Sequence, residues 1–350
     1  MPSDSPTGFY EKLIVWDAHA CLPLVPSLDL SALERHRAAG VTFVHVNVGM
    51  DYNPLDQIVR VLAGYRSWLA NHAEAFLLAQ SPDDVRQAKH DGRLAVAFDL
   101  EGSMMLQDDL NMLRLFRDLG VRQMHLAYNR NNSISGGCHD DDRGLSSLGR
   151  HVVERINNLG IIMDCSHMGL RSSLDAMEVS TRPVVFSHSN VKALCDHPRN
   201  ITDAQIDACA KTDGVIGICG IGPFLGDDDI STDLLLRHVD YIAERVGPRH
   251  VGFGLDYVFD QSHDDLPSSE DRDYWYPATQ NYKLTTMKIK PPEDLPEIAN
   301  ALLARGYRLE EVSGFMGGNF LRVAEATWPR MPGLASGFAN ASREAAVPIP

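Results

Sequence analysis

Short apolar runs rich in β-branched residues recur along the chain, with amphipathic segments between them. Each run has the length and composition of a buried β-strand. The runs occupy residues 13–20, 41–48, 93–102, 121–129, 160–167, 182–189, 214–222 and 250–257. The hydrophobic pattern therefore predicts eight strands.

The segments between these runs show the periodicity of helices. Residues 55–72 place apolar side chains at three- and four-residue steps, which gathers them on one helical face. Residues 144–160 carry a serine near the start and end at glycine, and residues 233–247 also end at glycine, as helices commonly do. Eight alternations of strand and helix predict parallel strands joined by right-handed crossovers.

The number of strands favours one fold within the α/β class. Eight repeats fit a closed (β/α)8 TIM barrel better than an open doubly wound sheet. No GxGxxG motif follows the first run, as a dinucleotide-binding fold would require. We expect residues 1–328 to form this barrel as a single domain. Residues 329–350 are rich in proline, alanine and serine, which predicts a tail that lies along the surface or frays.

Charge and cysteine content narrow the class of protein. The chain has 350 residues and a net charge of −15, which repels phosphate backbones and anionic membranes, so neither nucleic acid nor a membrane is an expected partner. The sequence shows no signal peptide and no apolar stretch long enough to span a bilayer. Six scattered cysteines without a CxxC pair indicate reduced thiols and predict a cytoplasmic protein.

Polar residues stand where the predicted strands end. In TIM barrels the reactive groups lie at this end of the strands, so residues from different strands would converge there. The residues concerned are His19, Cys21, Glu101, Tyr128, Asn129, His167, His188 and Asp256. Five of the strand ends supply a potential metal ligand, and this convergence is harder to obtain by chance than any single one.

The first strand ends in a pair, His19 and Cys21. Two-residue spacing puts both side chains on one face of a strand, which suits either a buried structural pair or two metal ligands. On the third run Glu101 shares a face with two alanines, and on the eighth Asp256 shares a face with two glycines. Small residues beneath an acid are what a crowded barrel interior requires.

Imidazoles and a carboxylate that meet in a concave site suit Zn²⁺ or a similar divalent ion. Glu101 could bridge two such ions about 3.5–4 Å apart, the spacing of two-metal hydrolytic sites. Such ions lower the pKa of a shared water and polarise a carbonyl. Asp256 would then take a proton from the water and pass it to a leaving amine. This set of residues predicts metal-assisted amide hydrolysis.

Six motifs extend over nearly the whole chain, from residue 17 to residue 323. They are DAHACLPL (17–24), DLEGS (99–103), the long block 126–167 that ends in DCSH, the block 183–203 that contains SHSN and HPRN, GFGLDY (252–257) and GGNFLRV (317–323). In this order they resemble the membrane (renal) dipeptidase family, peptidase family M19, within the amidohydrolase superfamily. The resemblance implies a metal-dependent amidohydrolase-type barrel, a zinc-dependent dipeptidase and, by analogy, a homodimer.

The resemblance also implies a role for each matching residue. It assigns His19 and Cys21 to a first metal, Glu101 to a bridge, and His167 with His188 to a second metal. Asp256 would be the proton shuttle, Tyr128 would contact the substrate, and Arg199 would clamp its terminal carboxylate. The expected cofactor is zinc, with two ions per chain favoured over one. The expected partner is a small dipeptide-like substrate with a free carboxylate.

Two positions depart from the family pattern. The family usually has aspartate where this chain has Cys21. A thiolate is a legitimate zinc ligand, but an ordinary buried thiol would leave one ion on His167 and His188. Tyr128 stands where the mammalian type has histidine, and Tyr-Asn resembles the bacterial members. A tyrosine hydroxyl can still donate a hydrogen bond to a developing oxyanion.

Several alternatives stay open. The family often accepts a D-residue at the C-terminal position, so the substrate could be an L-Xaa-D-Xaa dipeptide, or another amide or lactam that ends in a carboxylate, such as an N-acyl amino acid or a β-lactam. A barrel that has lost its first metal and only binds ligands is a further reading. We interpret His45 and His125 as structural. The long polar segment after the eighth strand contains YWYP (274–277), which could wall the pocket or lie in a subunit contact, and we favour a pocket wall over disorder.

Overall fold

The computed structural model describes residues 6–260, 266–282, 284 and 286–328. Its strands form one parallel sheet in the order β10-β1-β2-β4-β5-β6-β7-β8-β9, and β3 also pairs with the first residues of β4. The strands are β1 (Trp16–Cys21), β2 (Phe43–Met50), β3 (Phe76–Leu78), β4 (Leu94–Glu101), β5 (Val121–His125), β6 (Ile162–Asp164), β7 (Val184–Phe186), β8 (Val215–Ile218), β9 (Val251–Phe253) and β10 (Tyr257–Val258). Each of the eight predicted runs overlaps one of these strands, and the last run overlaps both β9 and the first residue of β10.

The last predicted run closes the sheet on itself. Its first half, β9, pairs with β8, and its continuation, β10, pairs with β1. The backbone N–H of Asp256 donates to the carbonyl of His19 over 3.0 Å, and that of Phe259 donates to the carbonyl of Cys21 over 3.0 Å. The first and last strands therefore meet, and the predicted (β/α)8 barrel is confirmed.

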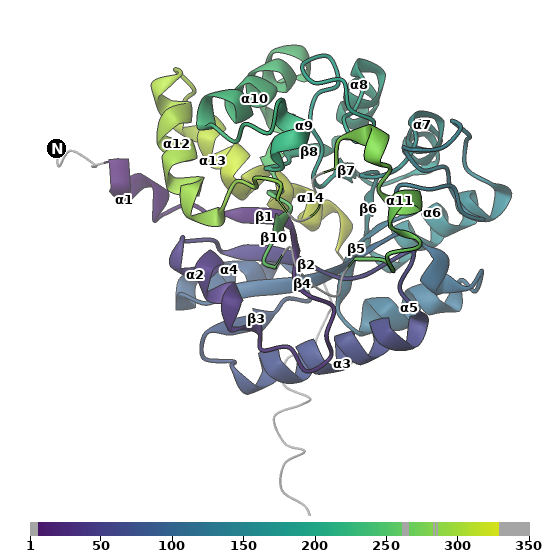
Figure 1. Cartoon of the computed structure of the whole chain (residues 1–350). Coiled ribbons are helices and arrows are strands. Elements are labelled where there is room, and N and C mark those ends of the chain that lie inside the picture. The colour runs from purple at the N-terminus through teal and green to yellow at the C-terminus, as the bar shows by residue number, and fades with distance from the viewer. Residues whose placement is uncertain (1–5, 261–265, 283, 285, 329–350) are drawn as a thin grey trace, which may run out of the picture.

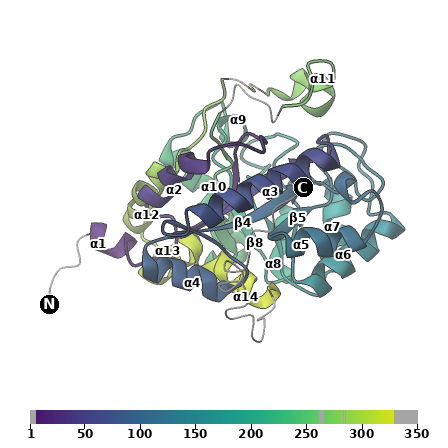
Figure 2. The same ribbon diagram turned by 90° about the horizontal axis from the view of Figure 1, so that it is seen from below.

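Helices surround the strands, as Figures 1 and 2 show. The longer ones are α3 (Leu55–Asn71), α4 (Pro82–Asp91), α5 (Asn111–Asp118), α6 (Ser147–Leu159), α7 (Leu170–Val179), α8 (Asp203–Lys211), α10 (Thr232–Val246), α12 (Leu295–Ala304) and α14 (Asn319–Thr327). The short ones are α1 (Pro6–Tyr10), α2 (Glu34–Ala38), α9 (Gly222–Leu225), α11 (Arg272–Trp275) and α13 (Leu309–Ser313). The three predicted helices correspond to α3, α6 and α10.

The predicted start and end of α6 have clear physical causes. The side chain of Ser146 accepts a hydrogen bond from the backbone N–H of Gly149 over 3.1 Å, which satisfies a donor that the first turn leaves free. Gly160 ends the helix with φ at +68°, a conformation that glycine adopts without a steric penalty.

In the described part of the chain, no helix combines the length and the apolar character needed to cross a bilayer.

Aromatic side chains fill the lower end of the barrel, which is the end at which the strands begin. Phe320 of α14 packs there with Trp16 and Phe43, whose ring centroids are 3.8 Å apart. A Cβ added to Gly252 would lie 2.5 Å from the Phe320 ring, which explains why this strand needs glycine. Among the described residues, apolar side chains therefore fill this end of the barrel, and the pocket lies at the opposite end, where the strands terminate.

His45 lies within this aromatic layer and is fully buried. Neither of its ring nitrogens has a hydrogen-bond partner among the described residues. Burial lowers the pKa of His45 to about 4, so the ring is neutral at physiological pH.

The expected boundary at residue 328 stays a prediction, because residues 329–350 lie outside the described part of the chain.

Candidate metal centre and substrate pocket

The upper end of the barrel gathers the side chains that the sequence singled out. His19 and Cys21 come from β1, Glu101 is the last residue of β4, and the remaining ones, His167, His188 and Asp256, follow β6, β7 and β9. Together with His125 and Asp164, these residues form overlapping groups of three, and within each group the ligand atoms lie within 4.8 Å of one another. Parallel strands bring their ends to one side of the barrel, so residues up to 237 positions apart become neighbours.

The Oε1 atom of Glu101 is the point on which the imidazoles converge. It lies 3.1 Å from His167 Nε2, 3.4 Å from His19 Nε2 and 3.5 Å from His188 Nε2. This buried oxygen has no hydrogen-bond partner among the described residues, whereas Oε2 accepts a hydrogen bond from Asn47. A carboxylate oxygen without a donor, surrounded by imidazole nitrogens, fits a divalent cation.

The other ring nitrogen of each histidine is held by a polar side chain. The Nδ1 atom of His19 lies 3.0 Å from Asp99 Oδ2, and that of His188 lies 2.7 Å from Ser187 Oγ. The Nδ1–H of His167 donates to Asn129 Oδ1 over 2.7 Å. Such partners orient the rings and leave Nε2 free to bind a metal, as in known metal sites. The sequence reading had not assigned a role to Asp99 or to Asn129.

Burial and charge set the protonation of these groups. Burial raises the pKa of Glu101 to about 7, and a bound cation would lower it again. Burial also lowers the pKa of His167 and His188 well below their usual range, which keeps them in the neutral form that binds metals. Burial acts in the same direction on His19, but the carboxylates of Asp99 and Glu101 outweigh it and raise its pKa well above the usual range.

Cys21 lies beside the metal-binding face of His19. Its Sγ atom is 3.4 Å from His19 Nε2 and 3.9 Å from Asp256 Oδ1. Burial raises the pKa of the Cys21 thiol well above its usual range, so the thiolate needs a cation next to it. The position suits both a metal-bound thiolate and a neutral thiol, and the role of Cys21 as a ligand stays a prediction.

His125, which we interpret from the sequence as structural, also lies close to this centre. Its Nδ1 atom is 3.7 Å from Glu101 Oε1, and its Nε2 atom is 2.7 Å from Asp164 Oδ2. It therefore belongs to two of the groups that could hold a metal. His125 is the last residue of β5, so its side chain points into the barrel at the height of the ligands.

Three of the site residues have a left-handed backbone. The φ angles are +59° for Asn129, +65° for His167 and +56° for Asp256. Residues other than glycine rarely adopt this region, and each such residue costs about 1 kcal/mol or more. All three follow the end of a strand, at the side of the barrel where the candidate ligands converge.

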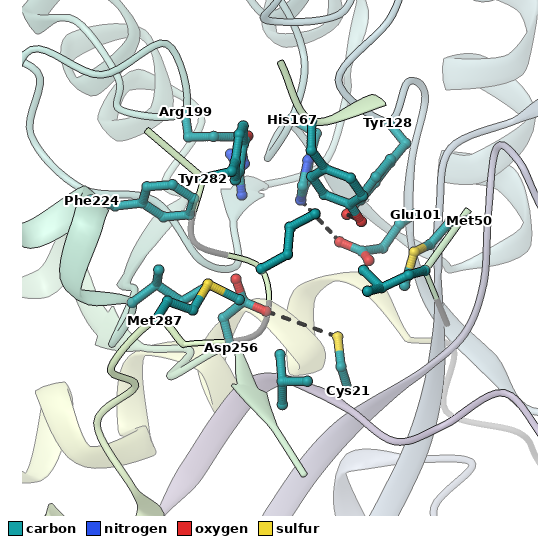
Figure 3. Close-up of a pocket in the computed structure, with 15 residues that line it drawn as sticks. Cys21, Met50, Glu101, Tyr128, His167, Arg199, Phe224, Asp256, Tyr282 and Met287 are labelled. Atoms are coloured by element: carbon teal, nitrogen blue, oxygen red, sulfur yellow. Dashed lines mark hydrogen bonds and ion pairs between the residues drawn. The ribbon is translucent and has the colours of Figure 1, made fainter. Parts of the chain in front are cut away.

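Above the metal-binding face lies a pocket of about 630 Å³. Arg199 lines it and is 3 % exposed, and its Nη2 donates to the carbonyl of His188 over 3.4 Å. The guanidinium carbon lies 5.5 Å from the centre of the Phe224 ring. No carboxylate of the described residues forms an ion pair with Arg199, so this buried cation is available to an anionic ligand. Figure 3 shows it across the pocket from Glu101.

The ring of Tyr128 covers one face of the His167 imidazole. Its ring stacks on that of His167 with 4.3 Å between centroids, and its hydroxyl lies 2.6 Å from the hydroxyl of Tyr276. Burial raises the pKa of Tyr128 well above its usual range, so the hydroxyl keeps its proton. Trp275 and Tyr276 are buried, and Tyr276 lines the pocket. The YWYP segment therefore contributes to the pocket wall.

An eight-stranded barrel with histidines and a carboxylate at the strand ends is the architecture of the amidohydrolase-type metalloenzymes, and solved structures agree with this class. An amidohydrolase from Pseudomonas aeruginosa is 26% identical and superimposes with a TM-score of 0.81 over 93% of this chain and 99% of its own. A metallopeptidase from Rhodobacter sphaeroides, solved with a phosphinate mimic of the dipeptide L-Ala-D-Ala, is 22% identical with a TM-score of 0.72, over 90% of this chain and 99% of its own.

Residues 28–270 match the membrane dipeptidase family, peptidase family M19, and the chain belongs to this family. Among curated proteins, the dipeptidase tcpJ of Claviceps purpurea is 29% identical over 80% of this chain and 60% of its own length. An uncharacterised protein from the pqqA 5' region of Klebsiella pneumoniae is 27% identical over 79% of this chain and 98% of its own length. The chain thus spans less than two thirds of the Claviceps protein.

Proposed function

We propose that this chain is a metal-dependent dipeptidase that cleaves the amide bond of small peptides with a free terminal carboxylate. The observation that carries the proposal is the convergence of three imidazoles on the unpartnered Oε1 atom of Glu101, with the buried cation Arg199 across the same pocket. A metal-binding face opposite an anion-binding group suits a short substrate that has an amide near its carboxyl end.

The residues present fit two divalent ions. His19 and Cys21 would hold one, His167 and His188 the other, and Glu101 would bridge them, as the family resemblance implies. Bound there, such ions polarise a carbonyl and lower the pKa of a water molecule. We propose zinc, because imidazole, thiolate and carboxylate ligands together suit it.

The side chains of the pocket supply the remaining chemistry. Arg199 would fix the substrate carboxylate by a bidentate pair, and the protonated hydroxyl of Tyr128 would donate to the oxyanion that develops on the carbonyl. Asp256 would take a proton from the attacking water and deliver it to the leaving amine. Its Oδ1 atom lies 3.7 Å from His19 Nε2, beside the proposed metal-binding face.

The stereochemistry of the substrate is a finer part of the proposal. The Rhodobacter sphaeroides metallopeptidase was solved with a mimic of L-Ala-D-Ala, and we propose that this chain also accepts a D-residue at the C-terminal position. Hydrolysis of L-Ala-D-Ala and L-Ala-L-Ala by the same preparation measures this preference. Hydrolysis of L-Ala-L-Ala without hydrolysis of L-Ala-D-Ala would contradict the proposed acceptance of a D-residue.

The decisive experiment combines metal analysis with a substrate panel. Protein purified under reducing conditions without added metal should contain close to two zinc ions per chain and should cleave dipeptides, but not the same dipeptides with an amidated C-terminus. Preferential cleavage of N-acyl amino acids or β-lactams would move the substrate class to those carboxylate-bearing amides. A chain that neither contains nor takes up metal would instead be a binding protein.

Location and assembly complete the proposal. All six cysteines are free, which is consistent with a reducing, cytoplasmic environment. We also propose a homodimer, by analogy with the family. Cell fractionation tests the first point, and the molar mass in solution, measured by light scattering, tests the second.

A further inference from the structure

Two apolar clusters flank the polar centre of the pocket. The Met50 cluster consists of Met50, Tyr128, Trp275 and Tyr276 with the half-buried Leu266 and Leu284. The Phe224 cluster consists of Cys219, Ile221, Phe224 and Ile289 with the half-buried Val258 and Met287. Tyr282 packs against both clusters. The two clusters therefore form a nearly continuous apolar wall.

The two clusters lie at opposite ends of the reacting centre. Met50 is the register partner of Glu101 in the pairing of β2 with β4, so the Met50 cluster adjoins the proposed metal bridge. Arg199 lies against the Phe224 ring, so the Phe224 cluster adjoins the proposed carboxylate anchor. Figure 3 shows Arg199 and Phe224 on one side and Met50 with Tyr128 on the other.

Charge within the pocket is confined to the reacting centre and to the anchor. Among the described lining residues, every one outside the clusters is either Arg199 or one of four residues at the centre: Cys21, Glu101, His167 and Asp256. These groups already have proposed roles in binding metal, moving a proton or holding the carboxylate. Among the described residues, neither cluster contains a charged side chain that could form an ion pair with a charged side chain of a substrate.

We infer that the site selects dipeptides with a bulky apolar side chain on both residues, and that Met50 determines the choice at the N-terminal residue. The inference rests on the proposed dipeptidase function. With the substrate carboxylate on Arg199 and its amide above Glu101, the C-terminal side chain meets the Phe224 cluster. The N-terminal side chain then extends to the Met50 cluster.

The expected discrimination follows from desolvation. An apolar side chain gains free energy when it leaves water for these walls, whereas a charged side chain loses its hydration without gaining an ion-pair partner among the described wall residues. Differences of one or a few methylene groups in an apolar pocket change kcat/KM by about 10- to 200-fold. A substrate with N-terminal leucine or phenylalanine should therefore exceed the glycine counterpart by about 10-fold or more.

The test compares kcat/KM for Gly-Leu, Leu-Leu, Phe-Leu, Lys-Leu and Glu-Leu with the zinc-loaded enzyme. We expect Leu-Leu and Phe-Leu to be cleaved fastest and Lys-Leu and Glu-Leu slowest. Equal values across the series, or a preference for a charged residue, would overturn the inference and leave the dipeptidase function intact. Failure to cleave any of the five would instead contradict the proposed function.

Substitution of Met50 tests its role directly. Met50→Glu should raise the ratio of Lys-Leu to Leu-Leu cleavage by about 10-fold or more, since a carboxylate would then face the N-terminal side chain. The matched control is Met104→Glu, because Met104 is 52% exposed and does not line the pocket; it should keep the wild-type ratio.

A second substitution of Met50 tests the same role if Met50→Glu does not fold. Met50→Ala enlarges the apolar end without adding charge, and it should lower the ratio of Leu-Leu to Gly-Leu cleavage by about 10-fold. Circular dichroism and zinc content establish that each variant is folded and loaded. A folded Met50 variant that keeps both wild-type ratios would overturn the role of Met50.

Discussion

Asn129 joins His167 to the wall of the substrate pocket. Its Oδ1 atom accepts a hydrogen bond from His167 Nδ1 over 2.7 Å, while its Nδ2 atom donates to the carbonyl of Trp275 over 3.1 Å. One amide therefore orients a proposed metal ligand and holds the segment that carries the pocket aromatics. The orientation of the imidazole and the position of the wall depend on the same side chain.

Two substitutions of Asn129 separate these contacts. Asn129→Gly suits the left-handed backbone and removes both, so zinc affinity should fall about 10- to 100-fold, as when other partners of metal-bound histidines are lost. Asn129→Asp keeps the acceptor for His167 and loses the donor to Trp275, so zinc content should persist while KM rises. Zinc titration and steady-state kinetics measure the two effects. Equal loss of zinc in both variants would show that the two contacts are not separable.

Removal of the Arg199 guanidinium should weaken binding of substrates with a free carboxylate. Arg199→Ala deletes a buried cation that faces the pocket, and the loss of a charge-assisted pair of about 2–3 kcal/mol raises KM by about 30- to 150-fold. Arg199→Lys should recover only part of this, since lysine lacks the planar fork. KM for a dipeptide, compared among the three proteins, gives the answer. An unchanged KM would remove Arg199 from the substrate site.

Cys21 should affect the metal content of the first site. Cys21→Ala removes the thiol beside His19 Nε2, so zinc should fall from close to two ions per chain to close to one. Cys21→Asp introduces the residue usual in the family and should restore the second ion. Elemental analysis gives the stoichiometry, and a thiolate-to-metal charge-transfer band in the cobalt-substituted wild type provides an independent readout. Wild-type zinc content in Cys21→Ala would show that the thiol is not a ligand.

His45 should make the fold sensitive to acid. Burial lowers its pKa to about 4, against about 6.5 in an unfolded chain, so the unfolded state binds the proton first. The contribution of the neutral His45 ring to the free energy of unfolding is fully present above pH 6.5 and is lost as the pH falls toward 4. At pH 5 about 2 kcal/mol of it is lost. Between pH 7 and pH 5 the free energy of unfolding, measured with urea, should therefore fall by about 2 kcal/mol less in His45→Leu than in the wild type.

His151 provides a matched control, because it is an exposed histidine on α6. His151→Gln should leave the pH dependence of the unfolding free energy as in the wild type. If His45→Leu follows the wild-type pH profile as well, another group is responsible for the acid sensitivity.

The hydrophobic pattern was sufficient for the barrel, because eight strands that are buried on both faces leave long apolar runs in the sequence. It did not reveal β3 or β10, which have three and two residues; such short segments carry no periodicity. β10 matters most, because it extends the last predicted run and closes the barrel on β1.

Residues at strand ends were predictable as a group, whereas their interactions were not. The ends of parallel strands meet, so Glu101 and the histidines could be expected near one another. The contacts of Asp99 and Asn129 depend on side-chain directions that only the folded chain defines. His125 was interpreted as structural, and its place among the candidate metal ligands follows from its position as the last residue of β5. The apolar wall combines strand ends with the long segment after β9, which sequence proximity does not indicate.

The closure of the barrel has a consequence for when activity can appear. The contacts that join the two ends of the barrel also bring Asp256 to Cys21, across 235 positions of sequence. During synthesis the N-terminal part emerges first, so the first strand must wait for nearly the whole chain before its metal-binding face is complete. A ribosome-bound fragment that ends before residue 256 would have no proton acceptor at this position. The proposed metal centre is therefore completed only after the last strand has been synthesised and has paired with β1.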